Sequence, residues 1–190
     1  MTISDRCGQS AGKIVVPNSL ITMKDNVNVL GKLKGKYLYY FLSGFVDGEG
    51  SFNISFAKHP TMKSRWIILT KFQIYQHQNH RDILELFRDV LGIGTIYKKS
   101  GSDVLALTVE SRQGLTEKII PFFKRYPLAT KAEAFRKFII IIGMLNRGEH
   151  QTRSGFEKIV HLAHSMNAEG RFRIYSEEYI LRTSEGKFRS

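Results

Sequence analysis

Asp47 and Glu49 are the side chains whose type and spacing could most readily do chemistry in this sequence. They alternate with Gly48 and Gly50, and the polar and apolar residues alternate over 51–56 as in a half-buried strand. The pattern predicts a helix that ends at these acids. Carboxylates at a helix C-terminus are disfavoured by up to about 1 kcal/mol unless a cation compensates. A divalent cation would compensate, and the oxygen ligands available at this helix end suit Mg²⁺. Because the chain has a net charge of +12, we expect these acids to bring metal ions to a polyanion.

Gly44 and Gly48 stand four residues apart, so they lie on one face of the predicted helix. That face carries almost no side-chain bulk, and two such helices could pack with their backbones close together. Only one copy of the motif is present, and the chain has no internal repeat.

Composition indicates one domain with a sizeable core, because 42% of the 190 residues are hydrophobic and 13 are Phe. The single Cys7 excludes a disulfide framework and fits a reducing compartment, such as a prokaryotic cytoplasm or an organelle matrix. The longest apolar run, from Phe138 to Leu145, is too short to span a bilayer, so we expect no membrane association. The positive charge favours nucleic acid as the partner, although ribosome-associated proteins are also basic.

The hydrophobic periodicity predicts an alternation of helices with pairs of strands. A basic arm over 1–36 precedes a domain over 37–172, and a tail over 173–190 follows it. Within the domain we expect helices at 39–46, 81–91, 114–126, 131–146 and 154–167, and strands at 51–58, 65–76, 94–99 and 103–110.

The segment from Leu42 to Gly50 resembles the core motif of the LAGLIDADG homing endonucleases. Blocks at 92–94, 119–123, 126–131 and 146–150 also resemble that family, in the family's order. The resemblance covers 37–172. It implies an α+β fold of αββαββα order, with a four-stranded antiparallel DNA-binding sheet and additional C-terminal helices.

The resemblance implies a site-specific, intron-encoded endonuclease that serves intron homing. Such an enzyme makes a staggered double-strand break in a long pseudo-palindromic DNA target by metal-dependent phosphodiester hydrolysis. Cutting two strands needs two active sites, and a chain with one motif can supply them only as a homodimer. We therefore expect a two-fold interface through Gly44, Asp47 and Gly48.

Three residues match family positions in the active site. Glu49, with the Gly48 carbonyl, is expected to hold Mg²⁺ against the scissile phosphate. Gln76 would order the solvent around the nucleophile, and Lys131 would stabilise the developing charge on the phosphate. The family often carries a second lysine after Lys131, where this chain has Ala132. His80 and Arg81 fall near another basic family position, and the sequence does not decide which of them matches it.

One face of the sheet is expected to read DNA in the major groove through alternate side chains. With Phe52, Ile54, Phe56, Phe72 and Ile74 turned inward, the neighbouring positions face outward. The predicted DNA-binding residues are Asn53, Ser55, Lys71, Gln73, Tyr75, Tyr97, Lys99 and Asp103, with Leu105 as a further member.

Two alternatives to an active endonuclease stay open. The same fold could bind intron RNA as a maturase-like protein, or it could be a catalytically inactive DNA-binding regulator. Retention of Glu49, Gln76 and Lys131 argues against an inactive site.

Overall fold

The computed structural model describes residues 32–62, 64–166, 173–184 and 188. The predicted arm lies outside the described residues except for its last five positions. The compact unit that contains the motif runs from Leu33 to Ser190.

Helix α2 (Gly35–Glu49) carries the motif and leads directly into strand β1 (Gly50–Lys58). It begins four residues earlier than predicted and buries Leu42, Ser43 and Val46. The amide of Gly50 still donates to the Val46 carbonyl. A Cβ at Gly50 would lie 2.4 Å from Val46 Cγ1 and 2.7 Å from its carbonyl oxygen. Only glycine therefore fits where the helix becomes a strand.

Four antiparallel strands form the sheet in the order β1-β2-β4-β3, which confirms the predicted four-stranded antiparallel sheet. Strand β2 (Trp66–His77) is the longest, and β3 (Thr95–Lys98) and β4 (Val104–Val109) are each shorter than predicted. Gly50 faces Ile74 across β1 and β2, and Gln73 faces Thr108 across β2 and β4. The carboxyl end of α2 therefore lies beside the last residues of β2.

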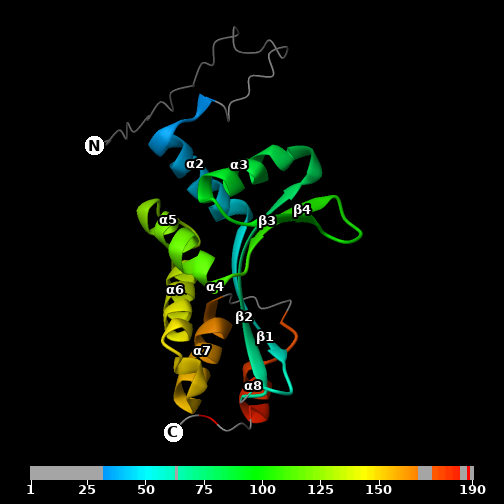
Figure 1. Cartoon of the computed structure of the whole chain (residues 1–190), viewed down its shortest axis with the longest axis vertical. Helices are drawn as coiled ribbons and strands as arrows, with labels where there is room; N and C mark the ends of the chain where they lie inside the picture. The colour runs from blue at the N-terminus through cyan, green and yellow to red at the C-terminus, as the bar shows by residue number, and fades with distance from the viewer. Residues whose placement is uncertain (1–31, 63, 167–172, 185–187, 189–190) are drawn as a thin grey trace, which may run out of the picture. The chain divides into compact units, whose positions relative to one another are not determined.

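Helices contact the sheet on the side of its buried residues. Helix α3 (Arg81–Leu91) contacts β2, β3 and β4, and α6 (Ala132–Asn146) packs on β1 and on α7 (Arg153–Met166). Two one-turn 3₁₀ segments, η2 (Gln78–His80) and η4 (Glu149–Gln151), precede α3 and α7. In Figure 1, α5, α6 and α7 run along one side of the long β1–β2 pair. The aromatic core between these layers includes Phe52, whose ring centroid lies 5.0–5.8 Å from those of Phe72, Phe123, Phe135 and Phe138.

The helix predicted over 114–126 is interrupted by a wider turn. It consists of α4 (Arg112–Gly114), a π-helical turn η3 (Leu115–Ile119) and α5 (Ile120–Arg125). The Ile120 amide donates to the Leu115 carbonyl, five residues back. Pro121 has no amide hydrogen to donate to the preceding turn, so the helix widens just before it.

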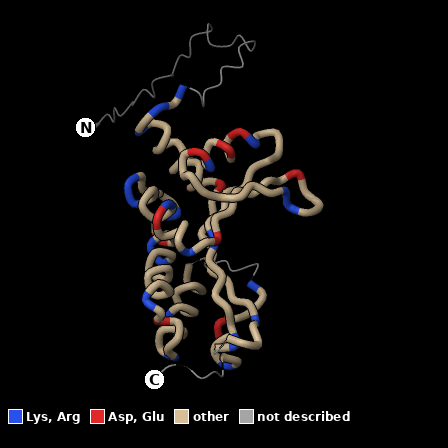
Figure 2. The backbone as a smooth tube through the Cα atoms, viewed as in Figure 1, with Lys and Arg blue, Asp and Glu red and all other residues tan. Residues whose placement is uncertain are grey.

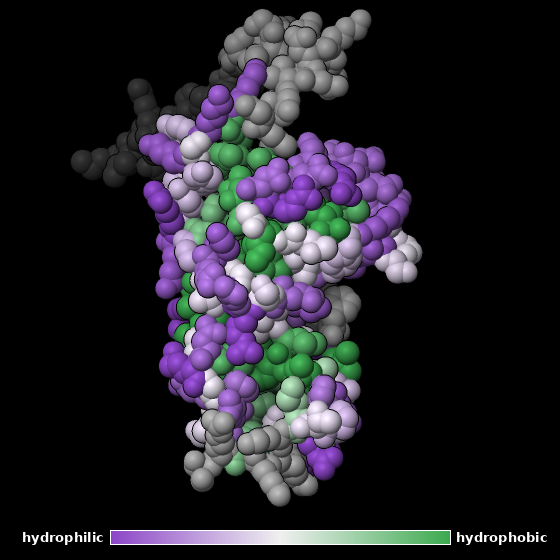
Figure 3. Space-filling view, in the orientation of Figure 1, coloured by the Kyte–Doolittle hydropathy of each residue, from purple (hydrophilic) through white to green (hydrophobic). Residues whose placement is uncertain are grey.

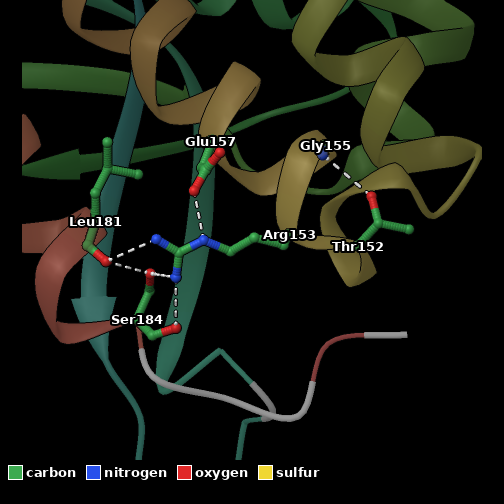
Figure 4. Close-up of polar contacts among 6 residues, drawn as sticks. All are labelled: Thr152, Arg153, Gly155, Glu157, Leu181 and Ser184. Carbon is green, nitrogen blue, oxygen red and sulfur yellow. Dashed lines mark hydrogen bonds and ion pairs between the residues drawn. The ribbon is translucent and has the colours of Figure 1, made fainter. Parts of the chain in front are cut away.

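The segment predicted as a tail contains a short helix, α8 (Glu177–Thr183), which packs on α7 inside the compact unit. Arg153, in the first turn of α7, donates to the carbonyl oxygens of Leu181 at 3.3 Å and Ser184 at 3.2 Å, and to Ser184 Oγ at 3.0 Å (Figure 4). The guanidinium is also paired with Glu157. Arg153 therefore caps the carboxyl end of α8.

The far end of the β1–β2 pair rests on the residues around α8 (Figure 1). Lys58 Nζ donates to Tyr179 Oη at 2.6 Å and lies 5.7 Å from the centroid of the Tyr175 ring. The Tyr175 ring meets Trp66 edge to face at 4.9 Å. Among the described residues, no helix has both the length and the apolar content needed to cross a membrane.

Arg153→Met should loosen α8 while leaving the sheet intact, because it removes the cation from three oxygen acceptors. Amide hydrogens of α8 should exchange roughly fivefold faster, which corresponds to about 1 kcal/mol. Arg182→Met is the matched control, since Arg182 is exposed on α8 itself. Equal protection of α8 in both variants would show that Arg153 does not hold it.

Candidate active site and nucleic-acid interface

Glu49 is the last residue of α2 and is exposed to solvent. Among the described residues it forms no ion pair and no side-chain hydrogen bond. Asp47, two residues earlier, is engaged within the chain. Its carboxylate accepts hydrogen bonds from the Ala129 amide at 2.6 Å, the Lys131 amide at 3.0 Å and the Thr130 hydroxyl at 3.1 Å. Glu49 is therefore the free carboxylate of the motif, and Asp47 is a structural one.

The surroundings of Asp47 favour its ionised form. Partial burial acts to raise the pKa of this carboxyl group, but the hydrogen bonds from Ala129, Lys131 and Thr130 outweigh it and lower the pKa below the ordinary value of 3.8. The carboxylate also faces the start of α6, where a negative charge is favourable.

Lys131 also contacts the end of α2 through its side chain. Its ammonium group donates to the carbonyl oxygen of Asp47, and to that of Gly48 at 3.2 Å. These carbonyls have no helical partner because α2 ends here. A positive charge therefore already occupies the position that the helix dipole favours.

The donor set at this helix end fits a divalent cation. The Lys131 ammonium shows that two adjacent carbonyl oxygens converge on one cation, and the Glu49 carboxylate follows directly in the chain. Carbonyl and carboxylate oxygens are the ligands that Mg²⁺ prefers. Within the described part of the chain, no group of three or more His, Cys, Asp or Glu side chains could hold a metal.

Gln76 lies at the same end of the sheet. It is the second-last residue of β2, two positions past Ile74, which faces Gly50. Its Oε1 accepts a hydrogen bond from the His77 amide at 2.8 Å. The structure thus brings Glu49, Gln76 and Lys131 to the junction of α2 with the sheet. Of the two ambiguous basic residues, Arg81 pairs with Glu85 at 2.7 Å on α3, and His80 is exposed.

Ser43 is a positioning residue that the sequence analysis missed. Its side chain is 2% exposed, and its hydroxyl donates to the carbonyl oxygens of Tyr126 at 2.8 Å and Pro127 at 3.1 Å. Ser43 and Asp47 lie one turn apart on α2 and hold successive parts of the 126–131 segment. The signal in the sequence is a hydroxyl among the apolar residues of a helix, which needs a partner when buried.

The polar face of the sheet follows the predicted alternation in β1 and β2. Phe52, Phe56, Phe72 and Ile74 are buried as expected, whereas Ile54, which was also expected to face inward, is only partly buried. The outward positions between them are partly exposed. In the register, Asn53 is opposite Lys71, and Ser55 is opposite Leu69. The predicted residues Asn53, Ser55, Lys71, Gln73, Tyr75 and Tyr97 share this face by register.

Two charged side chains on or beside this face have partners. Lys71 is paired with Glu110 at 2.5 Å, and Lys99 Nζ lies 4.9 Å from the centroid of the Tyr75 ring. Lys99 is therefore placed close to Tyr75, whereas the ammonium group of Lys71 is held by Glu110.

The alternation predicted for β4 is wrong by one residue. Leu105 is 5% exposed and belongs to the core, whereas Ala106 and Thr108 lie opposite residues of the polar face. Asp103 shares the alternation of Leu105 and pairs with Lys98 at 3.0 Å. The register therefore gives no support to a DNA contact by Asp103. The error arose because the alternation of β3 does not carry through the turn into β4.

Charged residues are unevenly distributed around this unit. Figure 2 shows Lys and Arg before and at the start of α2 and on α5 and α6, whereas α3 carries both acidic and basic residues. Hydrophobic residues are visible along α2 in Figure 3. On this helix, Phe41 is 38% exposed and Tyr40 is 55% exposed.

A family model described as LAGLIDADG endonuclease matches residues 42–142. The chain belongs to the LAGLIDADG endonuclease family. The match begins inside α2 and ends inside α6, so it includes the junction that carries Glu49, Gln76 and Lys131.

Relatives and solved structures of the LAGLIDADG family agree with this fold. The DNA endonuclease I-CeuI of Chlamydomonas moewusii is 38% identical over 116 residues, which are 58% of this chain and 53% of that protein. The homing endonuclease I-TnaI is 35% identical over 80% of this chain and 97% of its own, with a TM-score of 0.67. The archaeal intron-encoded homing endonuclease I-Vdi141I, solved with DNA, is 28% identical over 77% of this chain and 94% of its own, with a TM-score of 0.72. This chain thus spans about half the length of the curated relative.

Asp47→Asn should destabilise the fold. The side-chain amide is a weaker acceptor than a carboxylate, and its NH₂ group is a donor that would face the donors of the 129–131 segment. We expect a loss of about 1 kcal/mol at pH 7, allowing for partial exposure. Because the folded pKa of Asp47 is depressed, its contribution is present above the unfolded pKa and is lost as pH falls through the folded pKa. Denaturant unfolding of both proteins at pH 7 and pH 3 should show a smaller difference at pH 3. A difference independent of pH would exclude an ionised role.

Proposed function

We propose that this chain is a site-specific DNA endonuclease that acts as a homodimer and makes a staggered break in a long pseudo-palindromic target. The observation that carries the proposal is the end of α2, where Glu49 is free beside two carbonyl oxygens that already bind a cationic group. Membership of the LAGLIDADG endonuclease family supports it. An intron-encoded origin and a role in intron homing fit the name of the archaeal structure.

The metal is proposed to be Mg²⁺, held by the Glu49 carboxylate and the Gly48 carbonyl. When bound it would activate a water molecule and stabilise the charge on the leaving oxygen. Gln76 would orient solvent at this end of the sheet. Lys131 would contribute positive charge next to the reacting phosphate. Asp47 positions Lys131, since its carboxylate binds the Lys131 amide at 3.0 Å.

The homodimer is proposed to form through the exposed face of α2. A Cβ added at Gly44 or Gly48 would meet no described atom within 4 Å, so packing inside the chain does not require these glycines. A second α2 packed against this face would require them. It would also bring a second Glu49 close to the first, which would complete the carboxylate set that one chain lacks.

The rival functions are binding of intron RNA without cleavage, and DNA binding with an inactive site. Incubating the purified protein with DNA that spans its own intron's insertion point, with and without Mg²⁺, separates them from the proposed function. Cleavage of both strands at one position is expected only for an active endonuclease.

Glu49→Gln should abolish cleavage and leave specific DNA binding nearly unchanged, because the amide keeps the shape but not the charge that a metal needs. Cleavage and binding of one target duplex are measured side by side. Asp89→Asn is the control, since it makes the same charge change on α3. Cleavage by the Glu49 variant above a few per cent of the wild-type rate would remove Glu49 from the mechanism.

Gly44→Leu should convert the dimer to a folded monomer. Within one chain the new side chain meets open space, and leucine favours a helix over glycine by up to about 1 kcal/mol, so the fold should not suffer. In a helix pair, the same side chain would force the two backbones apart. Sedimentation velocity measures the assembly, with Lys158→Leu on the exposed face of α7 as the control. A stable dimer of the Gly44 variant would place the interface elsewhere.

A further inference from the structure

A connected set of polar side chains lies on the sheet face opposite the helices. It comes from three neighbouring strands: Gln73 and Tyr75 from β2, Thr108 from β4 and Tyr97 from β3. Thr108 lies directly opposite Gln73 in the register and is only 6% exposed. Tyr97 is 42% exposed. Thr108 is therefore too buried to reach a bound duplex, whereas Tyr97 is accessible to one.

The hydrogen bonds in this set have a definite direction. The Gln73 amide nitrogen donates to Tyr97 Oη at 3.0 Å and to Thr108 Oγ1 at 3.0 Å. Gln73 Oε1 accepts from the Tyr75 hydroxyl at 2.8 Å, and the Thr108 hydroxyl donates to Tyr97 Oη at 3.3 Å. Both amide hydrogens of Gln73 are thus engaged inside the protein.

This direction leaves different groups free on the two tyrosines. Tyr97 Oη accepts two hydrogen bonds, so its own hydrogen is left to donate outward. Tyr75 uses its hydrogen on Gln73, so only oxygen lone pairs remain for an outside partner. Burial, and then the nearby Tyr97, raise the pKa of Tyr75, with Lys71 acting in the opposite direction. The Tyr75 hydroxyl therefore keeps its proton at neutral pH.

We propose that Tyr97 and Tyr75 act as a donor and acceptor pair that reads one base edge, and that Gln73 and Thr108 are positioning residues. The inference rests on the proposed function, and it changes the role expected for Gln73 from reading a base to orienting the tyrosines. Such a pair matches adenine, whose major-groove edge has the N7 acceptor beside the N6 amino donor. Guanine presents two acceptors, N7 and O6, and O6 would face the lone pairs of Tyr75. The pair therefore favours adenine over guanine.

Binding to randomised duplexes in EDTA tests the proposal, because binding can be read without cleavage. The wild type should prefer adenine over guanine by roughly tenfold at one symmetric pair of target positions, as expected for a good base contact. Tyr97→Phe and Tyr75→Phe should each reduce this ratio to about threefold or less. Thr108→Val should reduce it at the same positions, although Thr108 is buried.

Thr95→Val is the matched control for Thr108→Val, since Thr95 is the β3 residue opposite Thr108 and lies outside the hydrogen-bonded set. It should leave the adenine preference at these positions unchanged. Thermal unfolding of each variant checks that the sheet is intact; both substitutions replace one β-branched residue with another, so folding should be preserved.

Direct reading by Gln73 predicts the opposite result. Tyr97→Phe would then free an amide hydrogen of Gln73 and would keep or increase the preference. That outcome, or an unchanged ratio in Thr108→Val, overturns the proposed roles while leaving the endonuclease function standing. If the wild type selects no sequence at all, the proposed function falls and this inference falls with it.

Discussion

The reciprocal contact between the end of α2 and the segment before α6 is the constraint on which the site depends. Asp47 binds the backbone at the start of α6, and Lys131 binds the carbonyls at the end of α2. Each helix terminus thereby receives the charge that its dipole favours. The two elements are more than 80 residues apart in sequence. Together with the hydrogen bonds from Ser43 to the carbonyls of Tyr126 and Pro127, this contact holds Lys131 at the end of α2.

The two acids of the motif differ in their surroundings because of this contact. The carboxylate of Asp47 has its hydrogen-bonding capacity satisfied by the chain itself, so it stabilises the fold. Within the described part of the chain, Glu49 has no such partners and is exposed to solvent, which is why the proposed metal role falls to Glu49. Two residues of similar chemistry, separated by one glycine, therefore differ in role because they point in different directions around the helix.

The sequence was sufficient for the order of the elements from α2 to α7, because hydrophobic periodicity and glycine positions depend mainly on local structure. The strands were placed within one residue, and α3 was placed at its observed ends. Features that depend on distant contacts could not be obtained in this way. The role of Ser43 needs the carbonyls of Tyr126 and Pro127, and the packing of α8 needs Arg153 and Lys58. Lys131 was expected near a phosphate, and its bonds to the end of α2 became visible only in the structure.

The direct passage from α2 into β1 limits how this protein can vary over evolutionary time. A one-residue insertion at Gly50 would turn the helix by about 100° relative to the strand and would reverse which side chains of β1 face outward. The geometry around Glu49 and the outward face of β1 would change together, so we expect lineages to tolerate few length changes at this point. A length change in the turns after β1 and β3 would not rotate α2 relative to β1, so length variation should accumulate in those turns. Under the proposed function, new target preferences should therefore arise in the strands by substitution.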